Sequence, residues 1–82
     1  MAEETTDILT VIAEITAKEA GVEASAISRE SRFAADLDID SLGLLTIATE
    51  VEERLGVILD DSAIPTLPTV GALVDLVADQ KG

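Results

Sequence analysis

The chain has 82 residues, and its apolar content of 48% is enough for one small core and excludes a disordered polypeptide. Seventeen acidic residues against five basic ones give a formal net charge of −12, which disfavours nucleic acid and anionic membrane surfaces as partners and favours basic protein surfaces. The sequence contains no His and no Cys, so it has no imidazole base, no disulfide framework and no thiolate metal site.

The composition also bears on location and domain organisation. The acidic segment from Met1 to Asp7 lacks the basic n-region and apolar run of a signal peptide, and no stretch approaches the length of a transmembrane helix. We therefore expect a cytoplasmic monomer without membrane insertion, folded as a single domain over residues 1–82. Short flexible ends are expected at residues 1–5 and 80–82.

A first helix is predicted from a cap at Thr5 or Thr6 to a stop at Gly21. Its apolar positions recur with helical spacing at Ile8, Val11, Ile12 and Ile15.

The segment 22–40 has no regular period and is rich in Ser, Ala and charged residues. Loops of this length are usually functional or anchored. We expect Ile27, Phe33 and Leu37 to enter the core at intervals and to pin the loop.

A second helix is predicted from Ser41 to about Leu55, ended by Gly56. Its core face is formed by Leu44, Ile47, Ala48, Val51 and Leu55. A different face carries the apolar and acidic residues Leu42, Leu45, Thr49, Glu52 and Glu53. That mixed face indicates either a minor core contact or an exposed docking patch.

Residues 57–68 read as a short and broken segment. Asp60, Asp61 and Ser62 can cap a helical turn through Ala63 and Ile64, whereas Pro65 and Pro68 prevent a long helix. A last helix is predicted after a cap at Thr69, with a buried stripe of Val70, Leu73, Val74 and Val77. These elements predict an all-α fold, a small antiparallel bundle of three longer helices plus one short helix, with a long loop between the first two helices.

Ser41 begins the second helix directly after three alternating acids, Asp36, Asp38 and Asp40. Without a base it is not a catalytic nucleophile, so we expect no enzyme activity and interpret Ser41 as a residue that another enzyme modifies. An EF-hand interpretation fails, because Ser41 stands at the place of the loop glycine and Ile47 at that of the bidentate glutamate; no metal site is expected. An ordinary helix N-cap at Asp40-Ser41 stays open as an alternative.

Residues 33–42, which read FAADLDIDSL, resemble the 4′-phosphopantetheine attachment motif of acyl carrier proteins. An aromatic residue, Phe33, lies eight positions before Ser41, and an acidic amphipathic helix starts at the serine. The helix stop at residues 21–22 and the opening of the last helix at residues 69–71 also match that family. The resemblance extends from about Ile8 to Val77.

The resemblance implies a discrete carrier of type II fatty-acid or polyketide synthesis and not an enzyme. Ser41, flanked by Asp40 and Leu42, would receive the 4′-phosphopantetheine arm from coenzyme A through a phosphopantetheinyl transferase, with Mg²⁺ assisting the phosphoryl transfer. The thiol of the arm would then hold acyl groups as thioesters. Expected partners are ketosynthase, acyltransferase and reductase-type synthase enzymes with basic docking surfaces.

The same resemblance implies which residues meet the partners and the cargo. The contacts to partner enzymes map onto Leu42, Leu45, Glu52 and Glu53. The residues facing a stored acyl chain would be drawn from Leu44, Ile47, Ala48, Ile64, Leu67 and Leu73, which can equally be ordinary core residues.

The chain also departs from the family pattern. Gly43 and Thr46 stand where carriers of fatty-acid synthesis commonly have acidic residues, so two charges are missing from the docking face and the identity of the partner enzymes stays open. Two other functions remain as alternatives, namely a peptidyl or aminoacyl carrier and an unmodified acidic adaptor that binds a basic partner.

Overall fold

The structure, a computed structural model, describes residues 3–81 and is helical. Its helices are α1 (Glu3–Ala20), α2 (Ser41–Leu55) and α3 (Val70–Lys81), with the 3₁₀ turns η1 (Ala24–Ala26) and η2 (Ile64–Thr66) between them. Within residues 3–81 there is no named strand, and one isolated bridge pairs Arg32 with Thr69. The predicted all-α bundle with a long first loop is thus confirmed.

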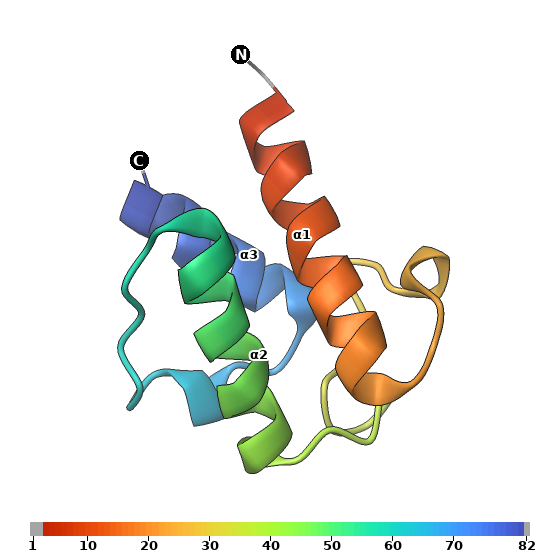
Figure 1. Ribbon diagram of the computed structural model, residues 1–82. Coiled ribbons are helices and arrows are strands. Elements are labelled where there is room, and N and C mark those ends of the chain that lie inside the picture. The colour runs from red at the N-terminus through yellow and green to blue at the C-terminus, as the bar shows by residue number, and fades with distance from the viewer. Residues whose placement is uncertain (1–2, 82) are drawn as a thin grey trace.

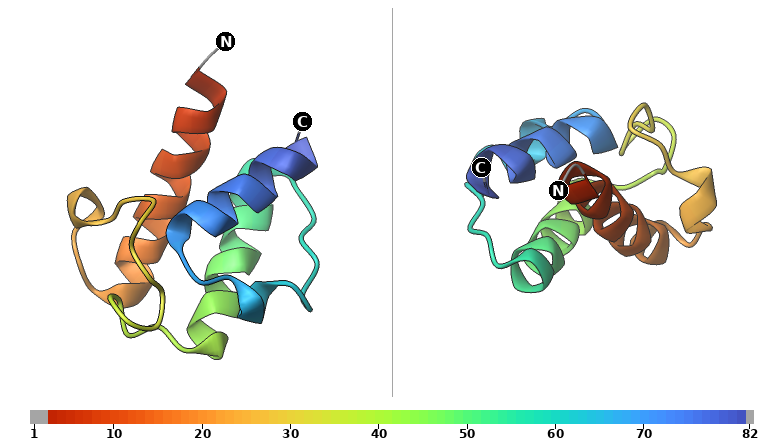
Figure 2. Two further views of the ribbon diagram at one scale, coloured as in Figure 1. Left: turned by 180° about the vertical axis from the view of Figure 1, so that it is seen from behind. Right: turned by 90° about the horizontal axis from the view of Figure 1, so that it is seen from above.

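The three helices enclose one core. α2 runs back antiparallel to α1, and α3 crosses behind α2, as the two opposite views show (Figures 1 and 2). α1 packs against both α2 and α3. The predicted core faces are buried, including Ile8, Ile12 and Ile15 of α1 and the four-residue stripe of α3, except that Val11 and Leu55 are only half-buried. No helix within residues 3–81 is long and apolar enough to cross a membrane.

The start of α1 lies earlier than the sequence predicted. The helix begins at Glu3, so Thr5 and Thr6 lie inside it and the predicted cap at either residue is wrong.

The C-terminal ends of α1 and α2 agree with the prediction. Both helices end at a glycine in the left-handed region, Gly21 with φ 75° and Gly56 with φ 67°. At the two ends of the chain, residues 3–5 and 80–81 have helical backbone, while Met1, Ala2 and Gly82 lie outside the described residues.

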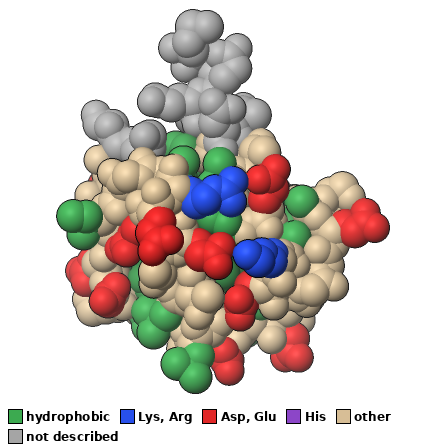
Figure 3. Space-filling model, in the orientation of Figure 1, with side chains coloured by type: hydrophobic (Ala, Val, Ile, Leu, Met, Phe, Trp, Pro, Cys, Tyr) green, Lys and Arg blue, Asp and Glu red, His purple; other side chains and the backbone are tan. Residues whose placement is uncertain are grey.

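Acidic side chains dominate the face of the molecule shown in Figure 3, with basic side chains between them. Two exposed ion pairs are present among the described residues, Arg29 to Asp75 at 2.9 Å and Arg54 to Glu14 at 3.4 Å. Exposed pairs of this kind contribute little to stability. The surface charge is therefore mainly unpaired and negative.

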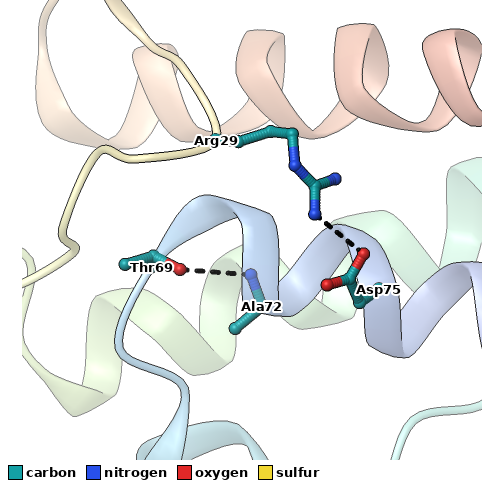
Figure 4. Close-up of polar contacts among 4 residues, drawn as sticks. All are labelled: Arg29, Thr69, Ala72 and Asp75. Atoms are coloured by element: carbon teal, nitrogen blue, oxygen red, sulfur yellow. Dashed lines mark hydrogen bonds and ion pairs between the residues drawn. The ribbon is translucent and has the colours of Figure 1, made fainter.

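The long loop is fastened to the start of α3. Phe33 and Ile27 are buried and Leu37 is half-buried, so the three predicted anchors do enter the core to that extent. In addition, the Gly71 amide donates to the Arg29 carbonyl at 2.9 Å, and the Arg29 guanidinium pairs with Asp75 on α3 (Figure 4).

Two further backbone hydrogen bonds join the same segments, from the Val70 amide to the Ser31 carbonyl at 2.9 Å and from the Phe33 amide to the Pro68 carbonyl at 3.3 Å. The predicted cap of α3 is confirmed, because the Thr69 hydroxyl accepts from the Ala72 amide at 3.2 Å (Figure 4). These contacts hold the loop that leads into α2, and thereby fix where Ser41 emerges.

The segment between α2 and α3 has a different cap from the predicted one. Asp60 accepts hydrogen bonds from the amide and hydroxyl of Ser62, at 3.0 and 2.7 Å, and these bonds lower the pKa of the Asp60 carboxyl. The helical turn itself is η2, which has Ala63 at its N-cap, no side-chain cap and Pro65 inside. The predicted acidic cap on the helical turn through Ala63 and Ile64 is thus wrong, because the Asp60 carboxylate bonds to Ser62 instead and η2 has no side-chain cap.

Candidate functional site

Ser41 is the first residue of α2 and is exposed at the end of the molecule where the long loop delivers the chain (Figure 1). Asp40, in extended conformation, is the N-cap: its carboxylate accepts from the Gly43 amide at 2.9 Å. The N-cap alternative is therefore confirmed for Asp40 alone. Within the described chain, no hydrogen bond engages the Ser41 hydroxyl or the amides of Ser41 and Leu42.

This arrangement has a chemical consequence. The hydroxyl of Ser41 is accessible and uncommitted, and two unpaired amides at the positive end of the helix dipole lie next to it. A phosphate ester on that hydroxyl would meet donors already pointing out of the helix. The residues present therefore fit a phosphate-linked group at Ser41.

Asp36 and Asp38 have structural roles that the sequence did not reveal. The Asp36 carboxylate accepts from the Arg32 amide at 2.9 Å and closes a turn in the loop. Asp38 has φ 56°, in the left-handed region where Asp is tolerated better than most residues. The three aspartates thus fit the local backbone in different ways: Asp36 closes a turn, Asp38 adopts a left-handed conformation, and Asp40 caps α2. No group of three or more acidic side chains within the described residues is arranged to hold a metal ion.

The exposed face of α2 begins next to Ser41. Leu42 is 73% exposed and Leu45 is half-buried. Thr46 and Thr49 turn their hydroxyls back to the carbonyls of Leu42 and Leu45, each at 3.0 Å. Because those hydroxyls are satisfied within the helix, the first half of the face presents mainly apolar atoms.

The two predicted charge contacts differ from each other. Glu53 is exposed, whereas Glu52 is half-buried and accepts a hydrogen bond from the Leu59 amide at 2.8 Å. Glu52 therefore fastens the segment after α2 to the helix. Next to this contact lies Ile58, which is 83% exposed and which no periodic pattern in the sequence singled out.

Gly43 is buried and tightly surrounded. A side chain there would place its first carbon 2.9 Å from the Cγ2 atom of Ile39 and 3.4 Å from a carboxylate oxygen of Glu19. An acidic residue at this position would bring a second negative charge against Glu19. Crowding by Ile39 and repulsion from Glu19 thus account for the absence of an acidic residue at position 43.

Along the side of α2 that meets α1 lies a polar cleft of about 330 Å³, lined by Lys18, Glu50, Glu53 and Arg54. Its lining carries two basic and two acidic side chains, and Arg54 is paired with Glu14. The cleft therefore brings both signs of charge together beside Glu53.

The candidate residues for a stored acyl chain lie in the interior. Leu44, Ile47, Ala48, Ile64 and Leu73 are each at most 4% exposed, and Leu67 is half-buried. The structure thus brings them into one core, to which α2, η2 and α3 all contribute.

Comparison with known proteins agrees with this geometry. The family model described as the phosphopantetheine attachment site matches residues 10–77. The chain is 38% identical to an acyl carrier protein of an Arthrobacter species over 92% of its length and 93% of the relative. It is 40% identical to that of Acidothermus cellulolyticus over 89% and 87%.

A solved structure of the acyl carrier protein from Enterococcus faecalis has the same fold. It superimposes with a TM-score of 0.77 at 25% sequence identity, covering 93% of this chain and 96% of the other.

A small helical bundle that exposes a serine hydroxyl without a hydrogen-bond partner at the start of its second helix is suited to carry a covalently attached group. The chain belongs to the phosphopantetheine-attachment family and, within it, to the acyl carrier proteins. The cofactor of this family is 4′-phosphopantetheine, and its members are carriers that work with a transferase and with synthase enzymes.

Proposed function

We propose that this protein carries its 4′-phosphopantetheine arm on Ser41 and presents acyl thioesters to the enzymes of fatty-acid or polyketide assembly. The observation that carries this proposal is the exposed Ser41 hydroxyl, unengaged within the described chain, next to two unpaired helix amides. When bound, the arm supplies the thiol that the chain itself lacks.

The residues around Ser41 have separate tasks in this function. Asp40 holds the start of α2 through Gly43, which keeps the serine at a defined place for the transferase. The amides of Ser41 and Leu42 are placed to stabilise the phosphate of the arm. Modification joins the Ser41 oxygen to the phosphorus of the arm and releases adenosine 3′,5′-bisphosphate from coenzyme A. Because no described side chain is hydrogen-bonded to the hydroxyl, the proton it loses would pass to a group of the transferase.

Partner enzymes would dock on the exposed face of α2. Leu42 and Leu45 offer apolar contact beside the arm, and Glu53 offers charge to a basic surface. Ile58 is exposed and adjoins Leu59, whose amide bonds to Glu52, so it would offer a further apolar contact near the end of α2. A ketosynthase, acyltransferase or reductase with a basic rim and an apolar centre fits this arrangement.

The interior would receive the acyl chain. The buried residues named above are aliphatic, and the one aromatic residue of the sequence, Phe33, packs in the same core. A flexible chain that enters this core would have to displace packed aliphatic side chains.

The first test is intact mass before and after incubation with coenzyme A, Mg²⁺ and a broad-specificity phosphopantetheinyl transferase. We expect the parent protein to gain one phosphopantetheine and Ser41→Ala to gain none. Ser62→Ala is the matched control, because Ser62 is exposed but lies outside α2, and it should be modified like the parent. A folded, previously unmodified parent that gains no mass would remove the proposal and leave the acidic adaptor.

A further inference from the structure

The core contains one unexplained polar group, the hydroxyl of Thr16 on α1. Among the described residues, Thr16 is the one buried residue with a polar side chain, and it is 0% exposed. Its Oγ1 atom has no hydrogen-bond partner there. Buried hydroxyls are normally paired, so an unpaired one requires an explanation.

The usual explanation for a threonine in a helix does not apply to Thr16. Such a hydroxyl commonly bonds to the carbonyl four residues earlier, as Thr46 and Thr49 do on α2. The Thr16 hydroxyl makes no such bond to Ile12. Its capacity to donate and to accept is therefore free for a group that enters the core.

Thr16 lies on the buried side of α1. It is one turn after Ile12, so the two residues share a face of the helix, and both are fully buried. Ile15 and Ala17 are buried as well, so Thr16 lies in the middle of the buried arc. Because α1 packs against α2, α3 and η1, this arc is covered by the other elements of the bundle.

We propose that Thr16 is a specificity residue for the acyl cargo, which hydrogen-bonds a carbonyl or hydroxyl oxygen of a chain stored in the bundle. A saturated alkyl chain would leave the hydroxyl unpaired, whereas an oxygen-bearing chain would satisfy it. The cargo class is accordingly a partly unreduced acyl chain. This inference rests on the proposed function, because it requires that acyl groups are loaded on Ser41.

The test compares wild type, Thr16→Val and Thr16→Ser, each loaded with octanoyl, 3-oxooctanoyl or 7-oxooctanoyl phosphopantetheine. Valine has the shape of threonine without the hydroxyl, and serine keeps the hydroxyl without the methyl group. The measurement is the rate at which the thioester is hydrolysed at one fixed alkaline pH, which falls when the chain is held inside. Intact mass first verifies loading.

For at least one oxo chain, we expect cleavage about five-fold faster in Thr16→Val than in wild type, the effect of one hydrogen bond of typical net strength. Thr16→Ser should stay closer to wild type, and octanoyl should show no such loss in Thr16→Val. If the ratio of the cleavage rate in Thr16→Val to that in wild type is the same for all three chains, the inference is overturned and the carrier function stays intact. Failure to load Ser41 would instead contradict the proposed function.

The melting temperature of the protein without an acyl group gives an independent test of the inference. Thr16→Val removes an unpaired buried hydroxyl at nearly constant volume, so its melting temperature should equal or exceed that of wild type. A clear fall would show that the hydroxyl has a structural partner, and the inference would then be wrong.

Discussion

Asp40 links the local backbone to the functional site. Its carboxylate closes the N-terminus of α2 onto Gly43, and in doing so it leaves the hydroxyl of the next residue, Ser41, uncommitted. A serine as the cap would have committed that hydroxyl to a backbone amide. Because Asp40 caps the helix, the hydroxyl of Ser41, the proposed attachment site, remains available.

We expect Asp40→Ala to lower the free energy of unfolding by about 1 kcal/mol, because the cap on the Gly43 amide is lost. Asp40→Asn removes the same charge but keeps the capping oxygen, so it should remain close to the parent. Urea denaturation of the three proteins measures the difference. Equal losses in both variants would mean that the charge matters and the cap does not.

At the level of the element, α2 has two faces with separate functions. Its buried face contributes Leu44, Ile47 and Ala48 to the core, and its exposed face runs from Leu42 to Glu53 beside Ser41. The helix thus joins the proposed docking face to the core in which we propose that the acyl chain is held. Ala48, the smallest residue of the buried face, is where added volume should matter most.

We expect Ala48→Leu to weaken the protection of a long acyl chain and to leave modification of Ser41 intact, because the larger side chain fills interior space. The observable is faster hydrolysis of a loaded acyl thioester. Thr49→Leu, at the exposed neighbouring position, adds a leucine outside the core and should leave the rate unchanged. Unchanged hydrolysis in Ala48→Leu would show that the chain does not use this space.

Across the whole molecule, the excess of negative charge opposes folding. The formal net charge of −12 is spread over a small surface, and the ion pairs among the described residues are exposed. Repulsion between like charges destabilises the compact state more than the expanded one. The same charge favours encounter with basic partner enzymes.

Raising NaCl from about 0.01 M to about 0.5 M should therefore raise the melting temperature, because the screening length falls well below the size of the protein. Thermal unfolding followed by circular dichroism measures this shift. The double variant Glu30→Gln and Glu53→Gln removes two exposed charges and should respond less to salt. A melting temperature that falls with salt would show that attractive pairs outweigh the repulsion.

Features that depend on neighbouring residues were predictable from the sequence. The bounds of α2, the glycine ends at Gly21 and Gly56 and the caps at Asp40 and Thr69 agree with the structure. Each depends on backbone geometry or on a bond that spans a few residues. The start of α1 was predicted wrongly, because the helix already begins at Glu3, before both cap candidates.

Features that join distant parts of the chain were not predictable. They include the bond from Gly71 to Arg29, the contact of Glu52 with Leu59 and the crowding of Gly43 by Glu19. The exposure of Ile58 and the unpaired hydroxyl of Thr16 belong to the same group. No spacing in the sequence encodes them, because each depends on which segments meet after folding.

The sequence by itself determined that this chain forms a small, acidic helical carrier domain with Ser41 at the start of its second helix. Composition, periodicity and caps act locally, and they suffice for that conclusion. The tertiary structure alone decided how the long loop is fastened, which acids are committed to the backbone and which polar group remains free in the core. Those properties follow from packing, since a side chain's partners are set by the elements that surround it and not by its neighbours in sequence.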